Sequence, residues 1–425
     1  MKLARIACLW LLGSAVLARS QETEINVNTR YTVEGVLISG DGWTTDVVAD
    51  GGEKLSSSLR RDLMALIGEK LNPVMLENVA KRLRKEFRAR SVSHRLLRGA
   101  SPEYVRVVFD LASRPTRFEI SVPKFLYHST QGWSGTVEGT ARVKKNSFTF
   151  GLVSDGDELI ERKAGLLARY ENSRLGSDRV KLRFEFDSFH TQWNRSTSEE
   201  LKPVHAGDSA DFSGVYRTRQ NFEPSLTIVL AKPLTLTVGT SFERFQMQYP
   251  EARTEAANAL TGALRYQRRM ETADLRHYLD ASYQLRAATG VLSSDFAYAR
   301  HRWHFQYSLN RGRHTLMDEA VGGIVTGRAP LFERYVLGNS STLRGWNKWE
   351  LDPLGGNRMV HNSVEYRYGI FQLFYDTGAI WDSGQNAVPR HSIGAGFRHG
   401  SFSLAVALPV RDGKVEPIFM VGMNY

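Results

Sequence analysis

Cysteine is nearly absent from this chain, since Cys8 is the only one among its 425 residues. It lies in an N-terminal segment that we expect to be removed, so the mature protein should hold no thiol. Because Cys8 precedes most of the apolar run in that segment, it does not fit a lipoprotein signal. Disulfide bonds and thiolate metal sites are therefore excluded.

Long apolar runs are also missing. Lys2 and Arg5 precede an apolar run that ends at Ala18, and this run is too short for a comfortable membrane span. Small residues at Ala18 and Ser20 fit a signal peptidase site, so residues 1–20 are expected to form a secretory signal peptide. No run of eighteen apolar residues follows, and no membrane helix is expected.

The charge balance is basic. Removing Lys2, Arg5 and Arg19 lowers the formal net charge from +11 to +8. An exported chain rarely meets nucleic acid, so anionic lipid head groups are the expected counter-charge. With many short strands, three classes stay open: a soluble periplasmic protein, a secreted protein or an outer-membrane barrel. A barrel hides its apolar face in alternation, so low hydropathy does not exclude it.

Residues 21–115 predict a small α+β domain with the order β-α-α-β-β. Tyr31–Gly40 is typical of a strand with a bulge at Gly35. Leucines at helical spacing then predict a first helix. Asn72, followed by proline, is a suitable N-cap for a second helix. The alternating stretch Tyr104–Leu111 predicts a strand of the closing pair.

The exposed side of the second helix is strongly basic. Its cationic residues are Lys81, Arg82, Arg84, Lys85, Arg88 and Arg90. A solvated helix face explains such a pattern, and so does attraction to lipid head groups or to an acidic partner.

From about residue 116 the helical period disappears and alternation takes over. In VKLRFEFD, for example, Phe184 and Phe186 point one way while Glu185 points the other. A sandwich also alternates, but paired charges on the polar face and Trp and Tyr near strand ends favour a transmembrane barrel. We count about fifteen or sixteen strands over roughly 310 residues and expect sixteen, antiparallel. Residues 146–425 are assigned to this barrel, whereas 116–145 could be a linker or the first barrel strand.

Motifs for catalysis or metal binding are weak. His301 and His304 would fall on opposite faces of a strand, which disfavours shared zinc ligation. Asp155–Glu158, DGDE, is interpreted as an acidic hairpin turn with at most unspecific calcium binding. No GxSxG elbow and no dinucleotide loop occurs. We expect no catalytic residue, no cofactor, no metal ion and no enzyme activity.

The C-terminal part carries the most specific motifs. LRGW (Leu343–Trp346) is followed by GGN (Gly355–Asn357), NSVEYRY (Asn362–Tyr368) and FYDTGAIWD (Phe374–Asp382). This order resembles the BamA/TamA-type outer-membrane assembly factor superfamily, whose members join POTRA domains to a surface-antigen-type barrel. In that family an Arg-Gly-aromatic motif lies on the sixth extracellular loop, which folds back into the lumen. Its arginine contacts acids on the next strands, one of them within Phe-x-Asp-x-Gly.

The resemblance assigns roles to two groups of residues. The loop-lock motif would be Leu343, Arg344, Gly345 and Trp346. Its lumen partners would be Glu365, Phe374, Asp376 and Gly378. Alternation agrees with this assignment, because Val364 and Tyr366 would face lipid and thus turn Glu365 into the lumen.

The two ends of the chain also resemble this family. Residues 21–115 look like one POTRA domain, placed in the periplasm. The last strand would form the assembly signal and a weakly paired seam, with its residues Phe419, Val421, Gly422, Met423 and Tyr425.

The resemblance implies a machine in the outer membrane of a diderm bacterium that inserts or translocates client polypeptides. Its implied partners are the lipid bilayer, outer-membrane or secreted clients, and periplasmic chaperones or accessory subunits. A single POTRA-like unit is fewer than assembly factors usually have. A dedicated two-partner-type translocator and a passive structural or pore-forming barrel are therefore the alternatives.

Overall fold

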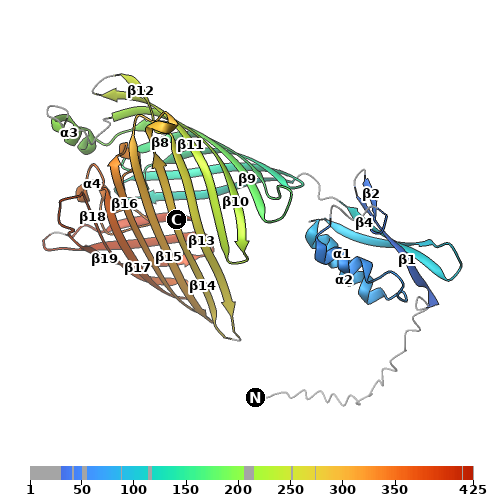
Figure 1. Cartoon of the computed structure of the whole chain (residues 1–425). Coiled ribbons are helices and arrows are strands. Elements are labelled where there is room, and N and C mark those ends of the chain that lie inside the picture. Colours follow the sequence, from blue (N-terminus) through green and yellow to red (C-terminus); the bar gives the residue numbers. More distant parts are fainter. Residues whose placement is uncertain are drawn as a thin grey trace, which may run out of the picture. The chain divides into compact units, whose positions relative to one another are not determined.

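The computed structural model describes residues 30–40, 43–49, 55–87, 89–112, 117–204, 215–249, 252–272, 274–413 and 415–424. The chain forms two compact units that divide between residues 114 and 115, and each is treated by itself (Figure 1). The expected signal peptide, residues 1–20, lies outside the described residues, as does Tyr425. No helix in the described ranges is long and apolar enough to cross a membrane.

The N-terminal unit is a four-stranded sheet with two helices. Its elements are β1 (Thr32–Gly40), β2 (Trp43–Asp46), α1 (Ser57–Met64), α2 (Pro73–Glu86), β3 (Ser91–Arg98) and β4 (Tyr104–Ala112). The sheet order is β2-β1-β4-β3. The predicted bulge is present, since the parallel β1–β4 register shifts between Val33 and Gly35. Both helices and the central strands contribute to one buried apolar cluster.

The predicted start of the second helix is confirmed, and the first helix begins at a serine cap. Ser56 Oγ accepts from the Leu59 N–H, and the Asn72 side chain accepts from the Val74 N–H. The predicted order β-α-α-β-β was wrong by one strand, because β2 pairs antiparallel with β1 at the sheet edge. Four residues give too short an alternation to be recognised in a sequence.

The second unit is a closed antiparallel barrel of sixteen strands. These are β5 (Arg117–His128), β6 (Gly132–Val143), β7 (Asn146–Asp155), β8 (Arg162–Asn172), β9 (Val180–Gln192), β10 (Val215–Ala231), β11 (Leu234–Tyr249), β13 (Ala259–Glu271), β14 (Arg276–Ala288), β15 (Ala297–Arg311), β16 (His314–Arg328), β17 (Arg358–Tyr368), β18 (Phe371–Trp381), β19 (Arg390–His399), β20 (Phe402–Val410) and β21 (Ile418–Met423). The short β12 (Arg253–Ala256) pairs only with β11. The sequence did not decide whether residues 116–145 are a linker or the start of the barrel. Strands β5 and β6 lie within this segment, so it belongs to the barrel.

The barrel wall alternates as the sequence predicts. Phe184 and Phe186 on β9 are exposed on the outside. Glu185, between them, faces the lumen and accepts a hydrogen bond from Arg169 Nε at 2.6 Å. Apolar side chains therefore cover the outer wall while charged pairs line the interior, which is the distribution expected for a wet lumen.

The two ends of the barrel differ. At one end short turns such as 312–313 and 369–370 join the strands, and we call this the short-turn end. At the other, the long-loop end, the helices α3 (Arg195–Val204) and α4 (Lys348–Leu351) lie within the connections (Figure 1). Residues 329–357, between β16 and β17, are named the lumen loop. They hold α4 and the short η3 helix (Leu331–Glu333).

Candidate functional site

Arg344, in the lumen loop, is only 9% exposed and faces the fully buried Asp376 on β18. Arg344 Nε donates to Asp376 Oδ2 at 2.9 Å, and Nη2 donates to Oδ1 at 2.8 Å. The Arg344 backbone N–H also donates to Oδ2, at 3.1 Å. This is a bidentate, charge-assisted pair, the geometry in which arginine binds carboxylates most strongly.

Further side chains complete the arginine's surroundings. Arg344 Nη1 donates to Glu365 Oε2 at 3.2 Å, and Nη2 donates to Ser363 Oγ at 3.0 Å. Its guanidinium carbon lies 3.4 Å from the ring centre of Phe374, a stacked cation–π contact. Burial by itself would lower the pKa of Arg344, but Asp376 and Glu365 raise it overall. The arginine thus stays charged inside the barrel.

Glycines bring the loop and the wall into close contact. A Cβ on Gly345 would lie 2.7 Å from both the Leu408 carbonyl carbon and Ser392 Cβ. A Cβ on Gly394 would come within 2.7 Å of the Phe374 ring. A larger residue at Gly345 would displace the lumen loop from the barrel wall, and one at Gly394 would displace the Phe374 ring that stacks on Arg344.

The rest of the lock motif binds the same side of the barrel. Trp346 Nε1 donates to the His391 carbonyl on β19 at 2.8 Å, and Leu343 is fully buried. A Cβ on Gly378 would lie 3.2 Å from Leu337 of the lumen loop, so this glycine leaves room for the leucine. The loop is therefore attached to β17, β18 and β19.

A second attachment joins the lumen loop to the connection between β7 and β8. Ser340 N–H donates to Asp157 Oδ1 at 2.9 Å, and its hydroxyl donates to Oδ2 at 2.5 Å. Lys348 Nζ donates to the carbonyls of Gly156, at 2.5 Å, and Leu159. Burial lowers the pKa of Lys348 to about 8, against the favourable effect of Asp157.

Asp157 also contacts the first barrel strand. Lys124 Nζ, on β5, lies 3.0 Å from Asp157 Oδ2. A chain of polar contacts thus runs from Lys124 through Asp157 and Ser340 to the lumen loop, and from Arg344 to Asp376 on β18. The loop links the first strand of the barrel, β5, to its thirteenth, β18. In the barrel order, β19, β20 and β21 lie between these two strands.

A third attachment lies on the wall made by β14 and β15. Glu333 of the lumen loop is 2.7 Å from Arg286 Nε on β14, and its carbonyl accepts from Arg300 Nε at 2.8 Å. Glu333 is buried, yet these arginines hold its pKa below the usual range against the opposing effect of burial.

The seam between the last and first strands is short. Strand β21 pairs with β5 through four residues, Met420 to Met423. It pairs with β20 through six, and β5 pairs with β6 through ten. A Cβ on Gly422 would lie 2.7 Å from Leu126 Cα, so the two strands approach closely where they do pair.

The structure brings Arg344 together with three of its four predicted partners, Glu365, Phe374 and Asp376. The fourth, Gly378, faces Leu337 of the lumen loop instead. Of the expected seam residues, Gly422 is buried whereas Phe419 is exposed on the outside. Val421 and Met423 are partly buried on the same outer face, and Tyr425 is not described. Sequence reasoning missed Asp157 and the second attachment. The acids of the DGDE stretch were the available signal.

No described group of three or more His, Cys, Asp and Glu side chains is arranged to hold a metal ion. An apolar outer wall, a charged lumen and a loop seated inside it define a transmembrane β-barrel with an occupied interior. Residues 147–412 match the Omp85 superfamily domain, and the chain belongs to this superfamily. That confirms the BamA/TamA-type resemblance. A sixteen-strand barrel of this family is an outer-membrane protein.

Solved structures similar to this chain include one BamA and two CdiB proteins. BamA from Haemophilus ducreyi lacking POTRA domains 1–3 is similar, with a TM-score of 0.67, 14% identity, and coverage of 93% of this chain and 84% of that one. CdiB from Escherichia coli has a TM-score of 0.49 and 13% identity, covering 93% and 76%. CdiB from Acinetobacter baumannii has a TM-score of 0.49 and 13% identity, covering 93% and 74%. A search of curated proteins gave no significant match.

Proposed function

We propose that this protein inserts or translocates client polypeptides at the seam between β21 and β5. The observation that carries the proposal is that β21 pairs with only a small part of β5. Strand β5 begins at Arg117, but only Phe125–His128 pair with β21. The part of β5 from Arg117 to Lys124 has no strand partner on that side among the described residues. Such an edge can template an incoming strand through its backbone groups.

The N-terminal unit is proposed to be a POTRA domain in the periplasm. Its sheet ends in β3, whose eight residues are almost all exposed. An extended client segment could add to this edge before it reaches the barrel.

The lumen loop is proposed to lock the barrel through Arg344. A dedicated translocator for one secreted partner is the second candidate within the family. A passive pore is less well supported, because the loop contacts the lumen walls at three places.

Depletion of this protein, followed by an inventory of outer-membrane and secreted proteins, separates these functions. Loss of several outer-membrane proteins is the expected result and supports insertion. Loss of a single secreted protein would instead identify a dedicated translocator. An unchanged inventory, together with a change in permeability to small solutes, would contradict the proposal and support a pore.

A further inference from the structure

One carboxylate on the barrel wall points outward instead of into the lumen. Asp318, on β16, is paired in register with Tyr307 and Val364, and Val364 is exposed on the outside. Its neighbour on the same face, Leu316, is also exposed. Alternation therefore turns Asp318 to the lipid side, whereas Glu319 faces inward.

Asp318 has a polar neighbour on the same face. Asn362 Nδ2, on β17, donates to Asp318 Oδ1 at 2.7 Å. This amide is neutral, and no ion pair of Asp318 is found within the described part of the chain. An ionisable side chain inside a membrane is costly and marks a candidate functional site. A cation at the lipid interface would remove that cost.

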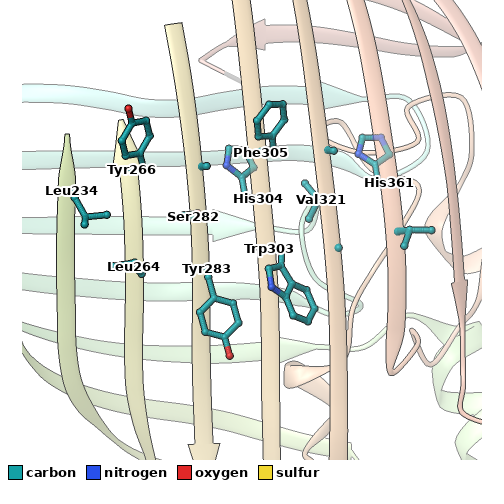
Figure 2. A pocket seen from close by; sticks show the side chains of 14 residues that line it. Leu234, Leu264, Tyr266, Ser282, Tyr283, Trp303, His304, Phe305, Val321 and His361 are labelled. Carbon is teal, nitrogen blue, oxygen red and sulfur yellow. The ribbon is translucent and has the colours of Figure 1, made fainter. Parts of the chain in front are cut away.

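An apolar groove of about 590 Å³ lies on the same outer wall, and it is lined by Ala320, two residues after Asp318. Its floor is made by small outward residues, among them Ala320 and Gly322. Tyr266 and Phe305 lie on one side of it, with Trp303 on the other (Figure 2).

The carboxylate and the groove are contiguous. Ala320 follows Asp318 two residues later on β16, which is about 7 Å along a strand. Asn362 is the register partner of Ala320. A molecule that fills the groove would thus have its end at the Asp318–Asn362 pair.

Aromatic side chains on the outer wall indicate how deep the Asp318–Asn362 pair lies in the membrane. Tyr307 donates to or accepts from His277 Nδ1 at 2.8 Å, and Tyr283 and His301 make the same contact at 2.8 Å. Amphipathic rings of this kind sit at membrane–water interfaces. Tyr307 is the register partner of Asp318, so Asp318 lies at the depth of this ring, within reach of lipid head groups.

We propose that this face binds one phospholipid whose head group carries a primary amine. The ammonium pairs with Asp318, and Asn362 holds the carboxylate in position. One acyl chain occupies the groove over Ala320 and Gly322. A phospholipid is favoured over a protein partner because the groove is apolar and lies on the outer wall, which faces the bilayer, and the bilayer supplies the cation. The site lies on β11 and β13–β17, away from the seam.

The test uses the full chain, purified in mild detergent with an equal mixture of phosphatidylethanolamine, phosphatidylcholine and phosphatidylglycerol of identical chains. Native mass spectrometry then reports the retained lipids. We expect one phosphatidylethanolamine per barrel, preferred about tenfold over phosphatidylcholine, whose quaternary ammonium donates no hydrogen bond. Asp318→Asn should abolish the preference. Asp274→Asn, an acid in a turn outside the groove, is the matched control.

A second variant tests the groove. A Cβ on Gly322 would meet only Trp303, at 3.8 Å, so Gly322→Leu fills the groove without disturbing the wall. Retention of every lipid should fall several-fold. Gly262→Leu, on open outer surface with nothing within 4 Å of its Cβ, should change nothing. Equal retention of the three lipids by the wild type, or unchanged selectivity in Asp318→Asn, would overturn the proposal. So would retention of a membrane protein in place of a lipid.

Discussion

Removing the Arg344 guanidinium leaves a carboxylate buried without its counter-charge. Asp376 is fully buried and receives three hydrogen bonds from Arg344. The backbone bond survives in Arg344→Ala, but both side-chain bonds and the stacking on Phe374 are lost. Breaking a buried pair of this kind costs about 3–5 kcal/mol. Arg344→Lys keeps the charge, but an ammonium cannot make the bidentate contact with Asp376. We therefore expect it to lower the stability by about half as much.

Unfolding kinetics measure this loss, because large barrels unfold irreversibly in practice. The folded form is followed by heat-modifiable gel mobility at a fixed temperature. If the contact is broken in the transition state for unfolding, about 3 kcal/mol accelerates unfolding by about 150-fold. Asp376→Ala and the double variant complete the cycle. The double variant should be no less stable than the worse single variant, giving a coupling energy of about 3 kcal/mol.

The exposed pair Arg142–Glu119 is a matched control on the same barrel. Its atoms are 2.9 Å apart, but the side chains are 54% and 39% exposed. Its coupling should stay below about 1 kcal/mol. Losses at Arg344 and Asp376 that add to within about 0.5 kcal/mol would refute a direct pair.

Three further changes test the seam and the loop. Tyr127 and Val421 face each other across the seam. A disulfide between Tyr127→Cys and Val421→Cys should form and stop client assembly. The control pair, Leu404→Cys with Val421→Cys, joins β20 to β21, and its disulfide should form and leave assembly intact. Gly345→Ala should raise the unfolding rate, since its Cβ has no room against the wall. Burial lowers the pKa of Lys348 to about 8 from 10.5, so the native state holds fewer protons than the unfolded chain between these values. Wild-type unfolding should therefore slow as pH rises through this window, and Lys348→Met should lose the dependence.

Much of the lock could be predicted because strands have a period of two. Once Tyr366 and Val364 are assigned to the lipid face, Glu365 must enter the lumen, and the same rule places Asp376 beside Phe374. The Arg344 contacts then follow from the resemblance. The ring of Phe374 is an aromatic side chain inside a polar lumen, and the guanidinium stacked on it explains this position.

The second attachment could not be predicted. Ser340 and Asp157 are 183 residues apart, and neither lies in a regular element whose period would orient it. Asp155–Glu158 was interpreted as an acidic turn because turns favour aspartate and glycine. That explanation accounts for the local backbone but not for the lysine on another strand that neutralises the charge.

The attachments of the lumen loop through Arg344 and through Asp157 matter because the seam between β21 and β5 is weak. Four paired residues supply only a few backbone hydrogen bonds, each of about 1 kcal/mol net. The buried Arg344–Asp376 pair alone contributes a stabilising free energy of similar size. The Asp157 contacts add to this stabilisation. We infer that the lumen loop, more than the seam, keeps β5 close to β18. The seam can then exchange its pairing with a client strand while the loop preserves the closed shape of the barrel. On this reasoning Asp157→Asn should weaken the hold on β5 and lower the yield of the seam disulfide. An unchanged yield would mean that the four seam residues suffice by themselves.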